Sequence, residues 1–548
     1  MNRVEGFHHE ADYMGKKGRL LWILLLLLYV LYAGAFIYRT SFVIEGKRHF
    51  NLFDDAMISM RYAKNLAQGH GLVWNPGGER VEGFSNPLWV FFMAAFHLLP
   101  VSPSKISLLI QISGAIFLIL NLFLVRKIAN FISGNSLLVS LGAAALTAFY
   151  LPLNNWALQG MEVSVLTLLL SLALWKTLKL LEADDFSLGL YILLGSCTLI
   201  RIDMAVPYLS ILTYLALVSR RQRWKNLGWG LLILAVFIGL QTLARFMYYH
   251  ELLPNTYLLK MTGYPLLLRL TRGIYTFLMF IYHFNWLLFL LPLGILFFRR
   301  DRIIGILFWV ILGQVLYSIW VGGDAWDWWG GSNRYISIAM PAFFVMFAYT
   351  LKKTGDFFRR LPVNGIQWTE RLISWGVVAF LFFSMLNFNI LGEFGFLRNW
   401  LLLDTPLWEK GNEKRVKEAL LLTRITDLQA TIAVTWAGTT PYFADRQAVD
   451  ILGKNDRTIA REKMRTMPGW SGLTYFVPGH LKWNYKHSFG KLKPDVIVQM
   501  WWNREEAALF LKTNYINKKV DGVRMFFRKD SPHVLWNKLD QVGLNANH

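Results

Sequence analysis

The sequence predicts a polytopic, all-helical membrane domain of about eleven transmembrane helices, followed by a small α/β domain. Hydrophobic residues make up 55% of the 548 residues and charged residues only 17%, whereas a soluble protein of this length needs far more polar surface. Apolar runs of about 17 to 25 residues recur between residues 20 and 391, and each can cross a hydrocarbon core about 30 Å thick. After residue 391 the apolar content falls, which predicts a separate domain over 392–548.

The number and orientation of the spans follow from the Lys and Arg residues, because positive charges near span ends are retained in the cytoplasm. Six basic clusters flank the apolar runs, at residues 16–19, 126–127, 176–179, 220–225, 299–302 and 352–360. All six lie on one face if the spans cover residues 20–38, 104–125, 136–153, 161–181, 187–200, 204–218, 227–248, 273–297, 303–321, 336–351 and 372–391. The protein is therefore expected in the cytoplasmic (inner) membrane, with a cytoplasmic N-terminus and an extracytoplasmic second domain.

One apolar stretch, Pro87–Leu99, would break this alternation if it crossed the bilayer. It is therefore expected to lie at the outer interface as a juxtamembrane or re-entrant helix. The outer face then receives residues 39–103, 249–272, 322–335 and everything after about 392.

Net charge and cysteine content limit the partners and the covalent cross-links of the protein. The formal net charge is +22, but the basic residues lie in short clusters beside apolar runs, so the anionic inner leaflet is an expected partner and nucleic acid is not. The single cysteine, Cys197, excludes an internal disulfide. A Gly-rich phosphate fingerprint on a βαβ unit is not evident, so no nucleotide cofactor is expected.

The second domain contains short segments with the pattern of buried strands, at Thr431–Trp436, Asp495–Met500 and Val523–Arg528. A helical pattern covers Glu413–Leu422. Strands alternating with helices favour a small α/β domain.

Asp54 and Asp55 are adjacent carboxylates at the start of a predicted helix in the first outer loop, with Arg61 on the Asp54 side. An Asp in this position caps its helix by accepting backbone N–H groups, but a helix needs only one cap. The second carboxylate can serve as a general base if its pKa is raised, or the pair can hold a divalent cation. Glu82, later in this Gly-rich loop, either contacts a sugar hydroxyl or is solvated.

The loop 322–335, GGDAWDWWGGSNRY, combines tryptophans with two acids and an arginine. Tryptophans at a span end form an interfacial belt by default. Flat aromatic faces with carboxylates also suit sugar rings, and Arg334 offers a planar fork for a phosphate. Trp326, Trp328 and Trp329 are the tryptophans concerned.

The outer loop 249–272 carries cations where the orientation rule disfavours them. They either attract an anionic lipid head group or snorkel at the interface. These cations are His250, Lys260, Arg269 and Arg272.

Two further polar groups interrupt apolar sequence. Arg201 and Asp203, between two short spans, are expected to form a structural ion pair. His480 and Lys482 follow a Pro-Gly turn in VPGHLKW, and they are either structural or, if the segment folds over the site, ligands.

Four stretches in order carry a family resemblance: the Asp54-Asp55 pair, GHGLVWNPGGERVEG, GGD…RY and VDILGKND…IAR…GHLKW. Together they resemble the C superfamily (GT-C) of membrane glycosyltransferases, which use polyprenyl-phosphate sugars. They look most like the terminal β-(1→2)-arabinofuranosyltransferase family of mycobacterial cell walls. The similarity spans nearly the whole chain in order and topology.

The resemblance implies an inverting transfer of a sugar, arabinofuranose in that family, from a polyprenyl-phosphate donor to a cell-envelope glycan or glycolipid. It implies that Asp54 deprotonates the acceptor hydroxyl and that Asp55 orients it or contacts a metal or the sugar. The matched residues of GGD…RY would hold the donor, and those of GHLKW would close over the site. The predicted binding residues are Arg61, Glu82, Lys260, Asp324, Arg334, His480 and Lys482.

Two other classes of protein stay open. A lipid-linked sugar flippase or other transporter would place its functional charges near the bilayer midplane, whereas these acids lie outside the predicted core. A non-catalytic envelope assembly protein would bind glycan through its second domain and tolerate the loss of both acids.

Overall fold

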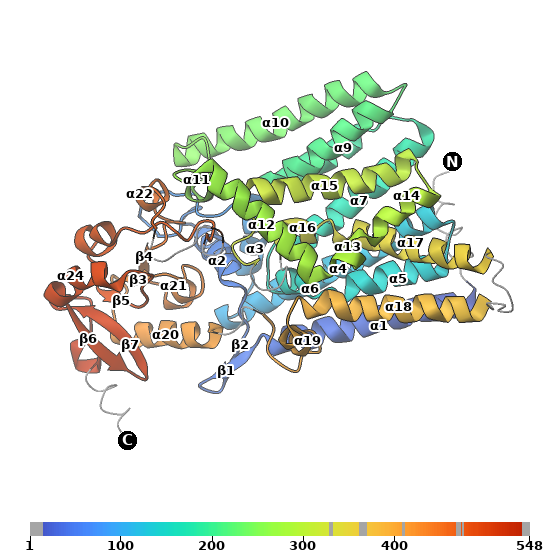
Figure 1. Cartoon of the computed structure of the whole chain (residues 1–548). Coiled ribbons are helices and arrows are strands. Elements are labelled where there is room, and N and C mark those ends of the chain that lie inside the picture. The colour runs from blue at the N-terminus through green and yellow to red at the C-terminus, as the bar shows by residue number, and fades with distance from the viewer. Residues whose placement is uncertain are drawn as a thin grey trace.

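The computed structural model describes residues 15–327, 333–360, 370–407, 411–466, 473 and 476–539. Its long helices pack side by side as a bundle, and a small sheet lies at one end of that bundle (Figure 1). We call residues 392 onward the tail. Trp328 and Trp329 of the predicted aromatic loop lie outside the described residues.

A helix or a bent group of helices stands at every predicted span. Apolar runs become helices because only a helix satisfies all its backbone hydrogen bonds within one segment in lipid. These elements are α1 (Lys16–Arg39), α4 (Pro103–Ser133), α5 (Leu137–Ala148) with α6 (Leu151–Leu158), α7 (Val163–Ala183), α8 (Leu188–Ile200), α9 (Ala205–Val218), α10 (Arg223–Tyr249), α12 (Leu266–Phe284) with α13 (Trp286–Leu290), η2 (Leu291–Gly294) and α14 (Ile295–Phe298), α15 (Arg302–Trp320), α17 (Met340–Arg360) and α18 (Glu370–Ile390).

The length and apolarity of these helices support a polytopic membrane domain. Within the described ranges, six helices are long and apolar enough to cross a membrane, namely α1, α4, α7, α10, α15 and α18. Two further spans are bent, by 52° between α5 and α6 and by 100° after α12. Pro152 lies in the first turn of α6, where a proline cannot continue the preceding helix. The bend after α12 is at Asn285, whose φ is 71° and whose side chain caps α13.

The basic clusters that are predicted to face the cytoplasm lie at the end of the bundle that is remote from the sheet. Arg299 donates to the carbonyl of Ile132 at the end of α4 (2.9 Å), and Ser219 donates to Asp184 after α7 (2.7 Å). The basic groups near the ends of α4, α7 and α9 and around Arg299 therefore share one end, as the alternation requires. The compartment that this end faces stays a prediction.

The first outer loop forms β1 (Phe42–Ile44), β2 (Lys47–His49), α2 (Asp54–Ala67) and α3 (Pro87–His97). With 11 residues, α3 is about 16 Å long, half of what a crossing needs. His97 Nε2 lies 3.1 Å from Tyr442 Oη in the tail. The helix therefore stays on the tail side, as its expected juxtamembrane position requires.

The tail contains a five-stranded sheet in the order β4-β3-β5-β7-β6. Its first three strands, β4 (Gln447–Asp450), β3 (Thr431–Val434) and β5 (Val496–Ile497), run parallel. The other two, β7 (Val523–Arg528) and β6 (Tyr515–Val520), are antiparallel. The three predicted strands are confirmed as β3, β5 and β7, and the predicted helix as α20 (Asn412–Ile425).

Short helices complete the described chain. They are η1 (Ile202–Met204), α11 (Asn255–Met261), α16 (Arg334–Ser337), α19 (Phe394–Trp400), α21 (Thr439–Ala444), α22 (Arg457–Ala460), η3 (Lys486–Lys491) and α24 (Arg504–Asn514). The carboxyl ends of β3 and β4 lead to residues that contact α2, because Thr439 and Lys454 both bind its first turn. This sheet edge therefore faces the first outer loop.

Candidate active site

Asp54 docks the tail onto α2. Its Oδ1 accepts a hydrogen bond from the backbone N–H of Thr439 (2.9 Å) and its Oδ2 one from that of Gly438 (3.2 Å). Burial raises the pKa of Asp54, against the attraction of Arg415 and these two N–H groups. The carboxylate thus caps a helix, as expected of one acid of the pair, but that helix is α21 and not its own.

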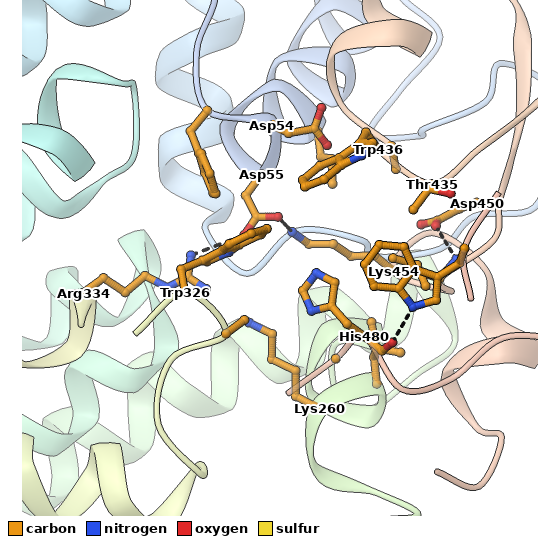
Figure 2. Close-up of a pocket in the computed structure, with 18 residues that line it drawn as sticks. Asp54, Asp55, Lys260, Trp326, Arg334, Thr435, Trp436, Asp450, Lys454 and His480 are labelled. Carbon is orange, nitrogen blue, oxygen red and sulfur yellow. Dashed lines mark hydrogen bonds and ion pairs between the residues drawn. The ribbon is translucent and has the colours of Figure 1, made fainter. Parts of the chain in front are cut away.

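Asp55 lies between two cations. Its Oδ1 is 2.8 Å from Lys454 Nζ and its Oδ2 is 3.3 Å from Arg334 Nη1, as the dashed lines in Figure 2 show. Burial acts to raise the pKa of Asp55, but Lys454 and Arg334 outweigh it and hold the pKa well below its ordinary value. Asp55 is therefore ionised in this arrangement.

Arg334 is held from behind by Asp324. Arg334 Nε lies 3.1 Å from Asp324 Oδ2, and its backbone N–H donates to the same oxygen (3.2 Å). The guanidinium also stacks on Trp156, 5.4 Å from the ring centroid. Asp324 is buried, so it fixes the direction of Arg334 and presents no carboxylate to a cavity.

Lys260 on α11 supplies a third cation. Figure 2 shows its side chain directed toward Asp55 and His480. Among the described residues, no hydrogen bond or ion pair is formed by its ammonium group. Burial lowers the pKa of Lys260, and the nearby Arg334 lowers it further. Lys260 is half-buried, and an ammonium group that is partly withdrawn from water without a partner is costly, which favours a site that receives an anion.

These four side chains, Asp55, Lys260, Arg334 and Lys454, are called the Asp55 cluster, and two cavities meet there. All four line both cavities, together with Ala325. The tail-side cavity is completed mainly by tail residues, among them Thr435, Trp436, Asp450, His480 and Trp501. The bundle-side cavity is completed by residues of the helices and their connections, among them Glu162, Arg201, Tyr257, Tyr317 and Tyr335.

The comparisons with known proteins agree on the fold. The structure is similar to that of ArnT from Cupriavidus metallidurans in the apo state, with a TM-score of 0.54 and 13% identity over 92% of this chain and 97% of that chain. It is equally similar to the same protein bound to undecaprenyl phosphate, with a TM-score of 0.53 and 11% identity over 94% of this chain and 99% of that chain. The fold of this chain is therefore similar to that of ArnT over nearly the whole length of both chains.

Sequence comparison adds one family. Residues 408–534 match a domain of unknown function, DUF8728, which covers the sheet of the tail. No curated protein sequence matches the chain. The GT-C expectation is thus confirmed for the fold, and the arabinofuranosyltransferase family stays a prediction.

Besides Asp324, three predicted binding residues lie away from both cavities. Arg61 donates to the carbonyls of Trp74 (2.6 Å), Arg446 (2.7 Å) and Pro441 and thereby ties the first loop to the tail. Glu82 forms a buried ion pair with Arg245 of α10. All of their polar atoms reach protein partners, so both residues are structural here and contact neither cavity, contrary to their predicted binding role.

Lys482 is the third. Its ammonium donates to the carbonyls of Ala460 (2.7 Å) and Leu258 (3.2 Å), and burial lowers its pKa to about 8. It therefore fastens the end of α11 to the tail, so that it positions the helix of Lys260 and does not close over the site. His480, two residues earlier, does line the tail-side cavity.

Sequence reasoning missed Lys454, Thr435, Trp436 and Trp501. They follow the parallel strands β4, β3 and β5, and residues at the carboxyl ends of parallel strands form the ligand crevice of α/β sheets. The loop that carries Lys454 is held in place by α11, because Asn255 Nδ2 donates to the carbonyls of Lys454 (2.9 Å) and Gly453 (3.0 Å). The missing signal was β4, which the sequence pattern did not predict.

Arg201 forms one ion pair more than the sequence predicted. It bonds Asp203 (2.6 Å), as predicted, and also Glu162 (3.0 Å), and all three line the bundle-side cavity. Glu162 was not predicted, because nothing local to its segment shows that Arg201 will fold beside it.

The two predicted metal ligands do not converge. Asp54 turns to α21 and Asp55 to the cations. Over the described residues, no group of three or more His, Cys, Asp or Glu could hold a metal ion. The dependence on a divalent cation stays a prediction.

Proposed function

We propose that this protein is a membrane glycosyltransferase that moves a sugar from a polyprenyl-phosphate donor to an acceptor hydroxyl at the Asp55 cluster. The observation that carries the proposal is the position of Asp55, an ionised carboxylate among three cations at the junction of two cavities. Two cavities suit two substrates, and a shared wall is where they would react. The similar fold of ArnT, which has been crystallised with undecaprenyl phosphate, supports a lipid phosphate as donor.

The donor phosphate binds the cations of the cluster. Lys260 needs an anion, and Arg334 presents a planar fork that suits phosphate oxygens. The bundle-side cavity holds the donor, because it lies among apolar helices that a polyprenyl chain can reach from the bilayer. Fixed positive charge beside the departing phosphate is the largest expected contribution to rate.

Asp55 accepts the proton. As the acceptor oxygen bonds to the anomeric carbon, its proton passes to Asp55, and the anomeric carbon–oxygen bond breaks with its electron pair going to polyprenyl phosphate. The phosphate draws Arg334, Lys260 and Lys454 toward itself. Their attraction for the Asp55 carboxylate is then weaker, and its basicity rises. Asp54 is a poorer candidate, since both its oxygens already accept backbone N–H groups.

The finer predictions belong to this proposal. The sugar is arabinofuranose, the acceptor is a cell-envelope glycan or glycolipid, and the reaction takes place on the outer face. These statements rest on the family resemblance and on the orientation rule.

The test is transfer by the purified full chain in lipid nanodiscs with polyprenyl-phosphate arabinofuranose and an arabinan acceptor. Asp55→Asn should lower kcat by about 10²–10⁴, the range for loss of a general base, and should still bind undecaprenyl phosphate. Asp445→Asn, which alters an exposed carboxylate paired with Lys64, is the control with unchanged activity. Wild-type turnover by Asp55→Asn would defeat the assignment, and lipid flux without transfer would favour the transporter.

A further inference from the structure

The tail-side cavity contains polar atoms that the protein leaves unsatisfied. Thr435 is only 7% exposed, and its Oγ1 has no hydrogen-bond partner among the described residues. A buried hydroxyl without a partner is unfavourable. This atom therefore indicates a ligand that donates or accepts a hydrogen bond there.

His480 offers a second such atom. Its Nδ1 lies 3.1 Å from the carbonyl oxygen of Pro478, which only accepts, so Nδ1 carries the proton of the neutral ring. Burial lowers the pKa of His480 to about 4, which keeps the ring neutral. Nε2 therefore has a free lone pair, and the described residues give it no donor. Figure 2 shows the ring facing the space beside Asp55, Lys260 and Lys454.

Aromatic rings form a large part of the remaining lining of the cavity. Trp326 and Trp436 lie nearly parallel, with ring centroids 5.9 Å apart and an angle of 24°. Trp501 also lines the cavity, and its Nε1 donates to the carbonyl of His480 (2.9 Å). An aromatic cavity with a few placed polar atoms is typical of a small-molecule site.

The chemistry of the lining selects the class of ligand. An amine would need a free carboxylate, but each carboxylate that lines the cavity already has partners. Both oxygens of Asp54 accept backbone N–H groups, those of Asp55 are paired with Lys454 and Arg334, and those of Asp450 accept from Leu452, Gly453 and Asn455. An acyl chain would leave Thr435 and His480 unsatisfied. A sugar ring has both an apolar face for the tryptophans and hydroxyls for the polar atoms.

We propose that the tail-side cavity is a carbohydrate-binding subsite in which the carboxyl ends of β3, β4 and β5 hold the terminal sugar of the acceptor. Thr435 and His480 hydrogen bond its hydroxyls, and Trp501 packs against the ring. This inference rests on the proposed function for the reaction that follows binding. It gives the matched domain of unknown function a role in substrate recognition.

The test measures binding of soluble probes to the full chain in nanodiscs by saturation-transfer NMR. The probes are methyl furanosides and methyl pyranosides, with n-butylamine and n-octanol as the alternatives. At least one glycoside should bind, and Thr435→Val should weaken it about tenfold, the usual cost of an unpaired buried hydrogen-bonding partner. Thr423→Val, an exposed position on α20, should bind as the wild type does.

The outcomes separate this inference from the proposed function. Asp55→Asn should keep glycoside binding while losing transfer. Absence of glycoside binding, preference for the amine or the alcohol, or equal binding by Thr435→Val and wild type overturns the subsite. Glycoside binding in a protein that never transfers sugar overturns the proposed function alone.

Discussion

Asp54 and Asp55 are neighbours with the same side chain, and they differ in what surrounds each carboxylate. Successive residues of a helix point about 100° apart, so the two acids meet different parts of the tail. Asp54 meets the N–H groups of α21, and Asp55 meets Lys454 and Arg334. The sequence indicates the pair, but the division of roles depends on partners 279 to 399 positions away.

Lys260 is expected to contribute to donor affinity more than any exposed lysine does. Lys260→Gln keeps the stem that packs on Gly479, whose φ of 80° suits glycine, and removes the charge. Undecaprenyl phosphate should then bind about tenfold or more weakly, since hydrogen bonds to charged groups are worth about 1.5–3 kcal/mol. Binding by microscale thermophoresis measures this effect.

The matched variant is Lys417→Gln on the outer face of α20, where the lysine is exposed. It should bind undecaprenyl phosphate as the wild type does. Equal weakening in both variants would mean that net charge, and not this site, attracts the lipid.

His480 should make stability depend on pH. Its pKa is about 4 in the folded protein against an ordinary value of 6.5, so the unfolded chain binds more protons between these values. The stabilisation is fully present above about pH 6.5 and is lost as the pH falls toward 4. Melting temperatures in detergent at pH 7 and pH 5 should show a larger drop for the wild type than for His480→Gln. Identical drops would contradict a ring that stays neutral in the folded protein.

At the scale of elements, the contact between α2 and α21 joins the first loop to the tail. Gly438 lies directly before α21 and packs closely on α2. A Cβ added to it would lie 2.1 Å from the carbonyl oxygen of Asp54. Arg61, about two turns further along α2, adds bonds to the carbonyls of Pro441 and Arg446. The tail-side cavity exists only while these elements stay docked.

Asp54→Asn should therefore act mainly on stability. One of the two acceptor oxygens becomes a donor facing an N–H group, which should lower the free energy of unfolding by about 1–3 kcal/mol. The melting temperature should fall and the tail should become more sensitive to trypsin, while measurable transfer persists in the folded fraction. A normal melting temperature with no transfer would instead support the sequence-based assignment of Asp54 as the base.

At the scale of the whole molecule, the sheet domain sits on the same end of the bundle as α3, α11 and the Asp55 cluster (Figure 1). Donor and acceptor can thus approach from different sides. The basic clusters near Ile132, Asp184, Ser219 and Arg299 gather at the opposite end. The orientation rule assigns that end to the cytoplasm.

Cysteine labelling can measure this orientation, because the single Cys197 is buried. Leu428→Cys, at a position 75% exposed in the tail, should react with a membrane-impermeant maleimide in intact cells. Asp185→Cys, exposed after α7, should react only after permeabilisation. The reverse pattern would place the site in the cytoplasm and exclude transfer on the outer face.

The sequence by itself determined the helical membrane domain, the short helix α3 and the α/β character of the tail. These features depend on local patterns, namely apolar length, charge at span ends and strand periodicity. It also indicated Asp55 as a second acid at a helix start, Lys260 and Arg334 as cations in outer loops, and His480 as a polar group after a Pro-Gly turn.

Only the tertiary structure decided which of the indicated groups meet. Arg61, Glu82 and Lys482 have the same residue types as true ligands, but their neighbours in space satisfy every charge. Lys454 lies in the VDILGKND stretch of the family resemblance, but that stretch did not indicate its contact with Asp55, since its position depends on β4 and on Asn255. Contacts between segments hundreds of residues apart arise from packing of the whole chain, and a local pattern carries no information on them.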